Sequence, residues 1–357
     1  MSLPDTNPGL VAADPTPLAL VSGRPLSHLT CEGRRMSLPR LHLISLGGTI
    51  ASTGAETSSG VGPKLGAADL VAAVPGLDGL AEITTEQLAQ VGSSSLTPDL
   101  VVAVARAARA AVDDGARGIV VTQGTDTLEE TAYLLSLLGD DRAPIAVTGA
   151  MRNPTLAGPD GPANLLAAAQ VALSDELRGV RSVAVFSDEI HDPQWVRKDH
   201  TTSTAAFTSG PHAGPIGWVH EGSVRLHGRP VAAPSVALPS TSIPPVALVP
   251  AGLGEDLRLV DALADLGYAG AVIDGVGGGH VHADAVPRLE ALAARMPVVL
   301  ASRTGSGLML ASTYGYPGSE LDLLGRGLRS AGPLPGRKAR LLLGVLLAND
   351  AVEDWPY

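Results

Sequence analysis

The sequence predicts an α/β protein with a parallel sheet in each of two domains, and three observations carry that prediction. Short apolar runs alternate with helical patterns along most of the chain, the order expected of parallel strands covered by helices. Five prolines fall among residues 228–245, where they interrupt any helix or central strand and indicate a linker. The 357 residues, 45% of them hydrophobic, are sufficient for a large core. We therefore expect a larger N-terminal domain at residues 38–227 and a smaller C-terminal α/β domain at residues 246–357.

Residues 1–37 are rich in Pro, Ser and Gly, and Met36 stands directly before a strand pattern. We expect this extension to be disordered or to precede the true start of the protein. It has neither a basic segment nor an apolar stretch of the length that a signal peptide or a membrane span requires. The sequence therefore predicts no membrane association and a cytoplasmic location.

Composition excludes several classes of function. The net charge of -11 argues against nucleic-acid binding, which depends on clustered Lys and Arg, and 3% aromatic residues leave few side chains for base stacking. Cys31 is the only cysteine, so disulfides and Cys-based metal sites are excluded. The histidines lack metal-ligand spacing. We expect no metal, no organic cofactor and no nucleic-acid partner.

The first predicted strand ends where glycines begin. Residues 41–46 form a short apolar run that stops at two glycines, so we expect a buried strand followed by a tight turn. Thr49 then lies just beyond the carboxyl end of the strand. The Gly- and Ser-rich stretch at residues 52–66 is a candidate mobile loop, and a short helix is expected at residues 67–74.

A second strand leads into another threonine turn. A helix is expected at residues 97–115, because Thr and Pro stand at its N-cap and first position and Gly stands at its end. A strand at residues 118–121 follows, and residues 127–130 (Thr-Leu-Glu-Glu) predict a capping box that opens a helix through residue 138. Thr125 and Asp126 therefore lie in a strand-to-helix turn.

The alternation of strands and helices continues to the end of the chain. Parallel sheets bind ligands beyond the carboxyl ends of their strands, and both threonine turns are at such ends. We therefore expect the functional site there. The remaining predicted elements are strands at residues 145–147 and 183–186 with a helix at 162–173 between them, and, after the linker, strands at 246–249, 271–274 and 298–301 with helices at 256–266, 283–294 and 338–347.

Two segments contain threonine in matching surroundings, residues 46–51 (LGGTIA) and residues 122–132 (TQGTDTLEETA). Glycine beside each threonine permits a strained turn and close approach of the backbone to a ligand. A single Gly-Gly-Thr is more often a turn or a helix cap, and the long second motif makes the combination specific. Together they resemble the two active-site signatures of the bacterial-type L-asparaginase (asparaginase/glutaminase) family. The resemblance runs from about residue 40 to the C-terminus, through residues 147–152, 160–165, 197–202 and 275–280.

The resemblance implies a fold and a reaction. It implies a flavodoxin-like N-terminal domain, with Thr49 as the nucleophile that attacks the side-chain amide of L-asparagine and forms an acyl-enzyme. Thr125, Asp126 and Lys198 would form the activating set. The chemistry agrees, because a neutral hydroxyl needs a base or a proton relay. Lysine must have a lowered pKa for that role, whereas a nearby carboxylate such as Asp126 stabilises the ammonium form, and the sequence leaves open which effect wins.

The resemblance also implies the contacts of a zwitterionic substrate. Ser93 resembles a contact to the α-carboxylate, and Asp126 would pair with the α-ammonium group. Backbone N–H groups near Thr125 and Ala150 would stabilise the oxyanion. Glu320 matches an acidic residue that the family supplies from a neighbouring subunit, so a homodimer or homotetramer is expected. Further substrate contacts implied by motif position are Gly48, Ser94 and Gly124.

Two residues depart from the family pattern. The family often carries a tyrosine in the loop after the first threonine, but no tyrosine occurs between Thr49 and Leu70. What removes the proton from Thr49 is therefore left open. His280 stands where the family commonly has asparagine, and a histidine there would alter the pH dependence or the accepted length of the substrate side chain.

Several alternatives stay open at this point. Glutaminase or D-asparaginase activity uses the same chemistry, since one methylene is worth only about 1–3 kcal/mol of discrimination. A subunit of a tRNA-dependent amidotransferase would usually carry an added N-terminal domain, for which residues 1–37 are too short. A catalytically silent amino-acid sensor is a third class. A dinucleotide site at residues 275–280 is disfavoured because His280 replaces the third glycine of the fingerprint, and no G-x-S-x-G elbow occurs.

Overall fold

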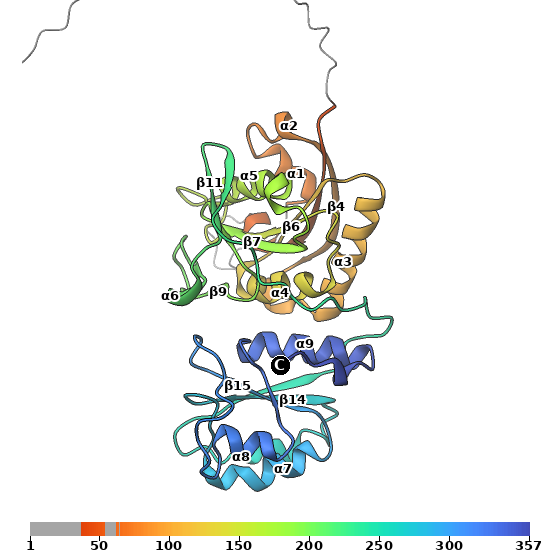
Figure 1. The fold of residues 1–357 in the computed structure, drawn as a ribbon. Helices are drawn as coiled ribbons and strands as arrows, with labels where there is room; N and C mark the ends of the chain where they lie inside the picture. Colours follow the sequence, from red (N-terminus) through yellow and green to blue (C-terminus); the bar gives the residue numbers. More distant parts are fainter. Residues whose placement is uncertain (1–36, 54–61, 64) are drawn as a thin grey trace, which may run out of the picture. The chain divides into compact units, whose positions relative to one another are not determined.

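The computed structural model describes residues 37–53, 62–63 and 65–357, and the chain from Leu38 onward forms one compact unit (Figure 1). Residues 1–36 of the predicted extension and most of the predicted mobile loop at residues 52–66 lie outside the described residues. Two main sheets, one of eight strands and one of four, carry the fold. The α/β class that the sequence predicts is confirmed.

The larger sheet has the strand order β12-β11-β8-β7-β6-β5-β1-β4. The five strands from β4 to β7 are parallel, and β8, β11 and β12 extend the sheet in antiparallel fashion. In chain order the parallel strands lie 2-1-3-4-5, which is the flavodoxin-like arrangement. The strands are β1 (Arg40–Gly47), β4 (Glu82–Val91), β5 (Gly118–Thr122), β6 (Ile145–Thr148), β7 (Ser182–Phe186), β8 (Glu189–His191), β11 (Gly217–His220) and β12 (Ser223–Leu226).

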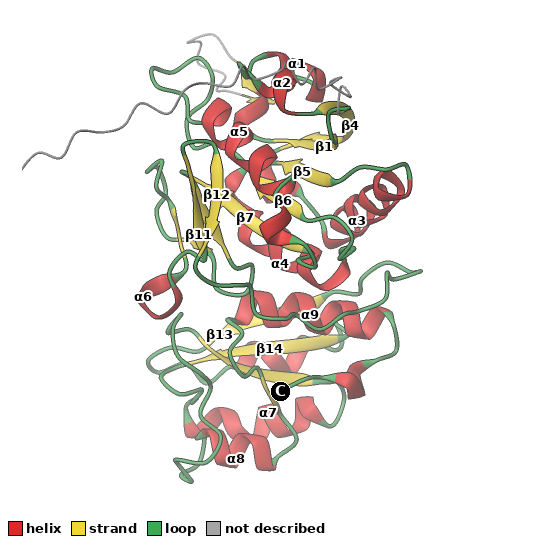
Figure 2. Cartoon of the chain, turned by 45° about the horizontal axis from the view of Figure 1, so that its top comes forward, coloured by secondary structure: helices red, strands yellow, loops and turns green. Residues whose placement is uncertain are grey.

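Helices cover both faces of this sheet, as Figure 2 shows. On one face α3 (Pro98–Asp113) and α4 (Leu128–Leu138) pack against side chains such as Ile119 and Val121. On the other face α1 (Ala67–Ala72) and α5 (Gly161–Ala172) pack against Val120. Because both faces are covered, the central strands read as continuous apolar runs rather than as an alternating pattern.

The two predicted helix starts have different outcomes. Thr97 caps α3 as predicted, with its hydroxyl accepting the N–H of Leu100 at 3.2 Å. The capping box predicted at Thr127 is wrong, because the Thr127 hydroxyl donates instead to the carbonyl of Ser93 at 3.0 Å. A 3-10 helix, Thr125–Thr127, precedes α4 and already pairs the N–H of Leu128. Thr127 therefore holds a neighbouring loop instead of the helix end.

The smaller sheet has the order β13-β14-β15-β16 and is parallel. Helix α9 (Gly336–Ala348) covers one face, and α7 (Val286–Ala293) and α8 (Glu320–Gly325) lie on the other (Figure 1). Apolar residues of α9 and α4 belong to one continuous core. The domain boundary at residues 228–245 therefore stays a prediction. The strands are β13 (Val246–Pro250), β14 (Gly270–Gly275), β15 (Val298–Ser302) and β16 (Arg329–Ser330).

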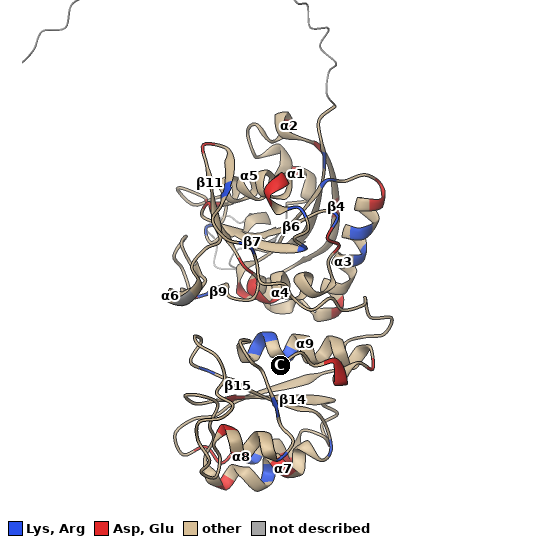
Figure 3. Ribbon diagram, in the orientation of Figure 1, with Lys and Arg blue, Asp and Glu red and all other residues tan. Residues whose placement is uncertain are grey.

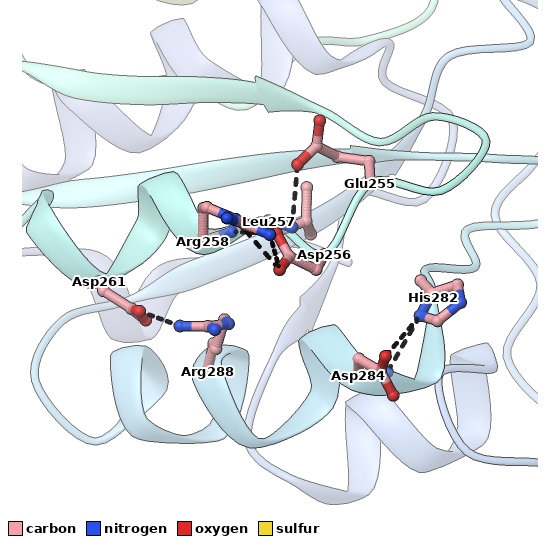
Figure 4. A network of polar contacts seen from close by, with 8 residues as sticks. All are labelled: Glu255, Asp256, Leu257, Arg258, Asp261, His282, Asp284 and Arg288. Atoms are coloured by element: carbon pink, nitrogen blue, oxygen red, sulfur yellow. Dashed lines mark hydrogen bonds and ion pairs between the residues drawn. The ribbon is translucent and has the colours of Figure 1, made fainter.

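The helix predicted at residues 256–266 is wrong, since only a short 3-10 helix, Arg258–Ala262, forms there. The Asp256 carboxylate accepts the backbone N–H of Arg258 at 3.1 Å and also binds its guanidinium (Figure 4). Leu257 takes a left-handed φ of 54°. Such local side-chain bonds compete with helical ones. An ion pair of Asp261 with Arg288 then ties the segment to α7.

Candidate active site

Four neighbouring strands of the larger sheet end beside one another at its carboxyl edge. In the order β6-β5-β1-β4, the turns that follow these strands contain Ala150, Thr125, Thr49 and Ser93. Long stretches of sequence separate these residues, and parallel pairing brings them to one edge. The predicted position of both threonine turns, beyond the carboxyl ends of strands, is confirmed.

Glycines let these turns pack backbone against backbone. Gly48 has a φ of 83°, and a Cβ there would lie 2.0 Å from the backbone nitrogen of Gly124. A Cβ on Gly124 would in turn lie 2.8 Å from the hydroxyl oxygen of Ser93. On the other side, a Cβ on Gly149 would lie 3.3 Å from a methyl carbon of Thr125. Only glycine permits this approach, so the turns that contain Thr49 and Thr125 are directly adjacent.

Thr125, Asp126 and Lys198 form a hydrogen-bonded group. Lys198, in the short strand β9 (Arg197–Lys198), donates from Nζ to the Thr125 hydroxyl at 2.8 Å and to the Asp126 carboxylate at 2.7 Å. Thr125 is buried, whereas the Asp126 side chain is 64% exposed. The hydrogen bond from Lys198 outweighs partial burial and lowers the pKa of Asp126. The group thus presents an ionised, accessible carboxylate beside a buried hydroxyl that contacts an amine.

The backbone around Lys198 is held by residues that the sequence analysis missed. The fully buried Glu129 carboxylate accepts the backbone N–H of Lys198 and also binds Arg337 of α9, at 2.7 Å. Figure 3 shows the basic residues of α9 on its side toward the acidic start of α4. Glu129 lies inside the second threonine motif, but the sequence analysis gave it no role of its own.

Lys338 of α9 supports the same segment from inside the protein. Its side chain is buried, and Nζ donates to the carbonyls of Gln194 at 3.0 Å and Val196 at 2.6 Å. Burial lowers the pKa of Lys338 to about 8, against the effect of nearby carboxylates. The strand that positions Lys198 is therefore anchored to α9 by two independent sets of contacts.

Ser93 is buried beside the second threonine turn. Its hydroxyl oxygen accepts the backbone N–H of Asp126 at 3.1 Å, which leaves its proton available to donate. This geometry suits a contact to a substrate carboxylate. Ser94 is exposed, and no hydrogen bond of its side chain is found in the described part of the chain. Its role stays a prediction.

The loop that contains Ala150 is fixed by the start of α5. The Asn164 amide donates to the carbonyl of Gly149 at 3.0 Å. The Asp160 carboxylate accepts the N–H groups of Met151 at 2.9 Å and of the next residue at 2.8 Å. A rigid loop of this kind keeps backbone donors in place, which is what stabilisation of an oxyanion requires.

Thr49 is connected differently. It begins a 3-10 helix, Thr49–Ala51, and Ser52 donates to the carbonyl of Gly48 at 2.8 Å, which closes the turn. Among the residues that the structure describes, the Thr49 hydroxyl has no hydrogen-bond partner. Residues 54–61 and 64, which follow it, lie outside the described part. No described residue is therefore hydrogen-bonded to this hydroxyl as a base would be.

A second polar cluster lies on the smaller sheet. Glu320, at the start of α8, is fully buried and accepts the N–H groups of Thr313 at 2.8 Å and Tyr314 at 2.7 Å. Its other oxygen lies 3.0 Å from Nε2 of His280, whose Nδ1 lies 2.9 Å from the Tyr316 hydroxyl. Burial raises the pKa of Glu320, but these hydrogen bonds lower it more, so the carboxyl is ionised at neutral pH. Glu320 forms no hydrogen bond with the threonine turns within the described residues.

Two kinds of feature are absent from the described residues. Over residues 37–53, 62–63 and 65–357, no three or more His, Cys, Asp or Glu side chains gather in a way that could hold a metal ion. Over the same ranges, no helix has both the length and the apolar character needed to cross a membrane.

Comparison with known proteins gives consistent matches over most of the chain. Residues 40–232 match the family model "Asparaginase, N-terminal", and residues 245–354 match "Glutaminase/Asparaginase C-terminal domain". A probable L-asparaginase of Deinococcus radiodurans is 37% identical over 87% of this chain and 94% of its own length. A probable periplasmic L-asparaginase of Haemophilus influenzae is 32% identical over 87% and 89%. The crystal structure of a probable cytoplasmic L-asparaginase from Campylobacter jejuni superposes with a TM-score of 0.79 at 29% identity, covering 89% of this chain and 99% of that one.

Proposed function

The chain belongs to the asparaginase/glutaminase family, and on that premise we propose that it hydrolyses L-asparagine by attack of Thr49 on the side-chain amide. As a member of the family it is an enzyme, an amidohydrolase of the asparaginase type. The Thr49 oxygen bonds to the amide carbon, ammonia leaves, and water then releases L-aspartate from the acyl-enzyme.

The observation that carries the proposal is the contact between the two threonine turns. Gly48 packs against Gly124, so the residue after each glycine, Thr49 and Thr125, borders the same space. Lys198 binds the Thr125 hydroxyl at 2.8 Å, which gives that hydroxyl a partner for proton exchange. Backbone N–H groups near Thr125 and Ala150 would face the oxyanion of the tetrahedral intermediate.

The polar groups around this space match the two charges of an amino acid. Asp126 is ionised and exposed, which suits the α-ammonium group. The Ser93 hydroxyl can donate to the α-carboxylate, because its oxygen already accepts from Asp126. Gly48, Gly124 and Ser94 would line the same pocket through their backbone or, for Ser94, its hydroxyl.

Ammonia release from L-asparagine tests the nucleophile directly. Thr49→Ala is expected to lower kcat by about 10³-fold or more, because the covalent step is lost. Acid-quenched wild-type protein is expected to carry an aspartyl adduct on the peptide that contains Thr49. Thr241→Ala, an exposed threonine far from the turns in sequence, is the control and is expected to leave activity unchanged. Undiminished activity of Thr49→Ala would contradict the assignment.

Two alternative functions would use the same residues, and assays with different substrates distinguish them from the proposed one. Glutaminase or D-asparaginase activity would appear in a kcat/KM panel across L-Asn, L-Gln and D-Asn, where one methylene accounts for only about 10- to 200-fold. A sensor without turnover is favoured by one observation, the lack of a described base near Thr49. Stabilisation by L-aspartate in a thermal shift without any ammonia production would support the sensor and contradict the hydrolase.

Assembly and location belong to the same proposal. A homodimer or homotetramer would allow a neighbouring subunit to complete the pocket, and light scattering of the purified protein measures that state. A cytoplasmic location is supported by the Campylobacter jejuni neighbour, whereas the Haemophilus influenzae relative is named periplasmic. Cell fractionation with an activity assay distinguishes the two compartments.

A further inference from the structure

A cavity lies at the amino edge of the larger sheet, the edge opposite to the threonine turns. Its lining comes from the start of β7, the end of α4, the turn after β8 and the first residues of the predicted linker. The cavity volume is about 260 Å³, many times the roughly 10–15 Å³ that one water molecule requires. A small organic molecule therefore has room here, away from the candidate active site.

Two buried polar side chains line this cavity without a hydrogen-bond partner. Ser182, the first residue of β7, is 2% exposed, and its hydroxyl bonds to no described residue. Gln194 is 5% exposed, and its side-chain amide also makes no hydrogen bond within the part of the chain that the structure describes. Buried polar groups in native proteins are nearly always bonded, so these two indicate a polar occupant.

Two guanidinium groups line the same cavity. Arg181 donates from Nη1 to three backbone carbonyls at 2.8–3.2 Å, and Arg229 donates to two backbone carbonyls at 3.2 and 3.3 Å. Among the described residues, neither arginine forms an ion pair with a carboxylate. The carbonyls hold the two side chains in place but leave their positive charges without a counter-ion, so both arginines favour an anionic group in the cavity.

Asp192 brings the opposite charge to this cavity. It is 3% exposed, and its two oxygens accept the backbone N–H groups of Gln194 at 2.8 Å and Val231 at 2.7 Å. Burial raises the pKa of Asp192, although these hydrogen bonds and the charge of Lys338 act in the other direction. No described cation forms an ion pair with Asp192. A buried carboxylate in this situation is stabilised by a cation that reaches it.

The two kinds of charge do not neutralise one another. Backbone partners fix Asp192 and Arg181 separately, and no ion pair joins them. A ligand with one ammonium and one carboxylate group would compensate both, and Ser182 and Gln194 would supply further hydrogen bonds. Because the charges of the protein stand apart, the ligand charges must also stand apart. Two or three carbon atoms between the ligand's charged groups suit this arrangement better than the single carbon of an α-amino acid.

We propose that this cavity is a second binding site, for a small zwitterion whose ammonium and carboxylate groups are separated by two or three methylene groups. Asp192 holds the ammonium group, and Arg181 and Arg229 hold the carboxylate. No residue of the threonine turns takes part. The inference therefore does not depend on Thr49 being the nucleophile, and it goes beyond the proposed function.

Calorimetric titration of the full-length protein tests the class of ligand. β-Alanine and γ-aminobutyrate carry both charges at the required separation, and we expect both to bind and to raise Tm. Propionate and ethylamine each carry one of the two charges and are the matched controls. They are expected to bind at least about ten-fold more weakly, because each leaves one buried charge of the cavity without a partner.

Matched aspartate variants test the site. Asp192→Asn keeps the shape of the side chain and removes its charge, and we expect the Kd for β-alanine to rise by about 10- to 100-fold. Asp141→Asn is the control, because Asp141 lines the same cavity but is exposed, and its Kd is expected to stay within about three-fold. Arg229→Gln, at an exposed position, is a second test that does not depend on a buried substitution, with an expected rise of about three- to ten-fold. Tm values show whether each variant folds.

The outcomes distinguish this inference from the proposed function. Weaker binding in Asp192→Asn and Arg229→Gln with unchanged binding in Asp141→Asn supports the site. Equal binding of propionate or ethylamine overturns the zwitterion. No binding of any probe means that water fills the cavity and overturns the inference. Competition by L-aspartate with no effect of Asp192→Asn would place the ligand at the threonine turns and also overturn it. Ammonia release by Thr49→Ala bears on the proposed function alone.

Discussion

The two threonine turns share a strand-end position and a neighbouring glycine but differ in how their hydroxyls are held. Thr125 is buried, and Lys198 fixes its hydroxyl at 2.8 Å. Thr49 is half-buried, and no described residue bonds its hydroxyl. The turn before Thr49 also uses a glycine at φ 83°, whereas Gly124 has an ordinary φ of -70°.

This difference indicates a division of roles. A hydroxyl that is held by an amine and packed on all sides is suited to pass a proton, since its geometry does not change during reaction. A hydroxyl that no described residue binds is free to approach a substrate carbon. The comparison predicts that the contacts around Thr125 affect the rate by holding its hydroxyl in place. Thr49 is predicted to affect the rate by forming the covalent bond to the substrate.

The largest expected effect is loss of the amine at Thr125. Lys198→Met removes both the hydrogen bond to Thr125 and the ion pair with Asp126, and we expect kcat to fall by about 10²- to 10⁴-fold. Steady-state ammonia release measures it. Lys198→Arg is expected to recover little of the lost kcat, because a planar guanidinium does not replace a compact ammonium at this short contact. Near-normal turnover in Lys198→Met would show that Thr125 needs no partner.

The packing of the two turns is the next contact to break. In Gly48→Ala the new Cβ would lie 2.0 Å from the nitrogen of Gly124, so the turns must separate. We expect kcat/KM to fall by about 10²-fold and stability by about 1–3 kcal/mol. Gly76→Ala is the matched control, because Gly76 has a φ of 82° with no atom near the added carbon. Equal losses of activity in the two variants would refute the packing argument.

A smaller effect is expected from the support behind Lys198. Lys338→Met removes the bonds to the carbonyls of Gln194 and Val196, and we expect kcat to fall by about ten-fold without loss of substrate binding. Thermal unfolding of the variant, monitored in parallel, shows whether the fold is kept. A kcat equal to that of wild type would mean that Glu129 alone positions Lys198.

The same variant is also expected to differ from wild type in how its free energy of unfolding depends on pH. Lys338 has a pKa of about 8 in the folded protein and an ordinary pKa of 10.5, so between these pH values the unfolded chain binds more protons. Stability from this residue therefore rises with pH across that window. We measure the free energy of unfolding of both proteins with denaturant. Between pH 8 and 10.5, that of wild type should rise relative to that of Lys338→Met by up to about 3 kcal/mol. A pH-independent difference would contradict a neutral buried Lys338.

The smallest expected effect concerns substrate binding at acid pH. Lys198 lowers the pKa of Asp126 below the ordinary 3.8, so the carboxylate that we propose to pair with the substrate ammonium stays ionised on moderate acidification. KM for L-asparagine, measured with stability monitored, should stay constant until below that value. In Lys198→Met the rise in KM should begin at higher pH, because the hydrogen bond that lowers this pKa is absent. An unshifted profile would remove Asp126 from the binding site.

Local patterns predicted the elements that depend on near neighbours. The strand before Thr49 and the Thr97 cap of α3 are confirmed because apolar runs and caps act within a few residues. The capping box at Thr127 and the helix at residues 256–266 were wrong for a related reason. There, polar side chains bond to other partners, a loop carbonyl for Thr127 and a nearby guanidinium for Asp256.

By itself, the sequence determined the family resemblance, the two threonine turns and the absence of a tyrosine after Thr49. Only the tertiary structure decided that Gly48 packs on Gly124, that Glu129 holds Lys198, and that Tyr316 bonds His280. These contacts join residues that are distant along the chain. Their geometry depends on how parallel strands align at a sheet edge and on how α9 packs, and no local pattern encodes those distances.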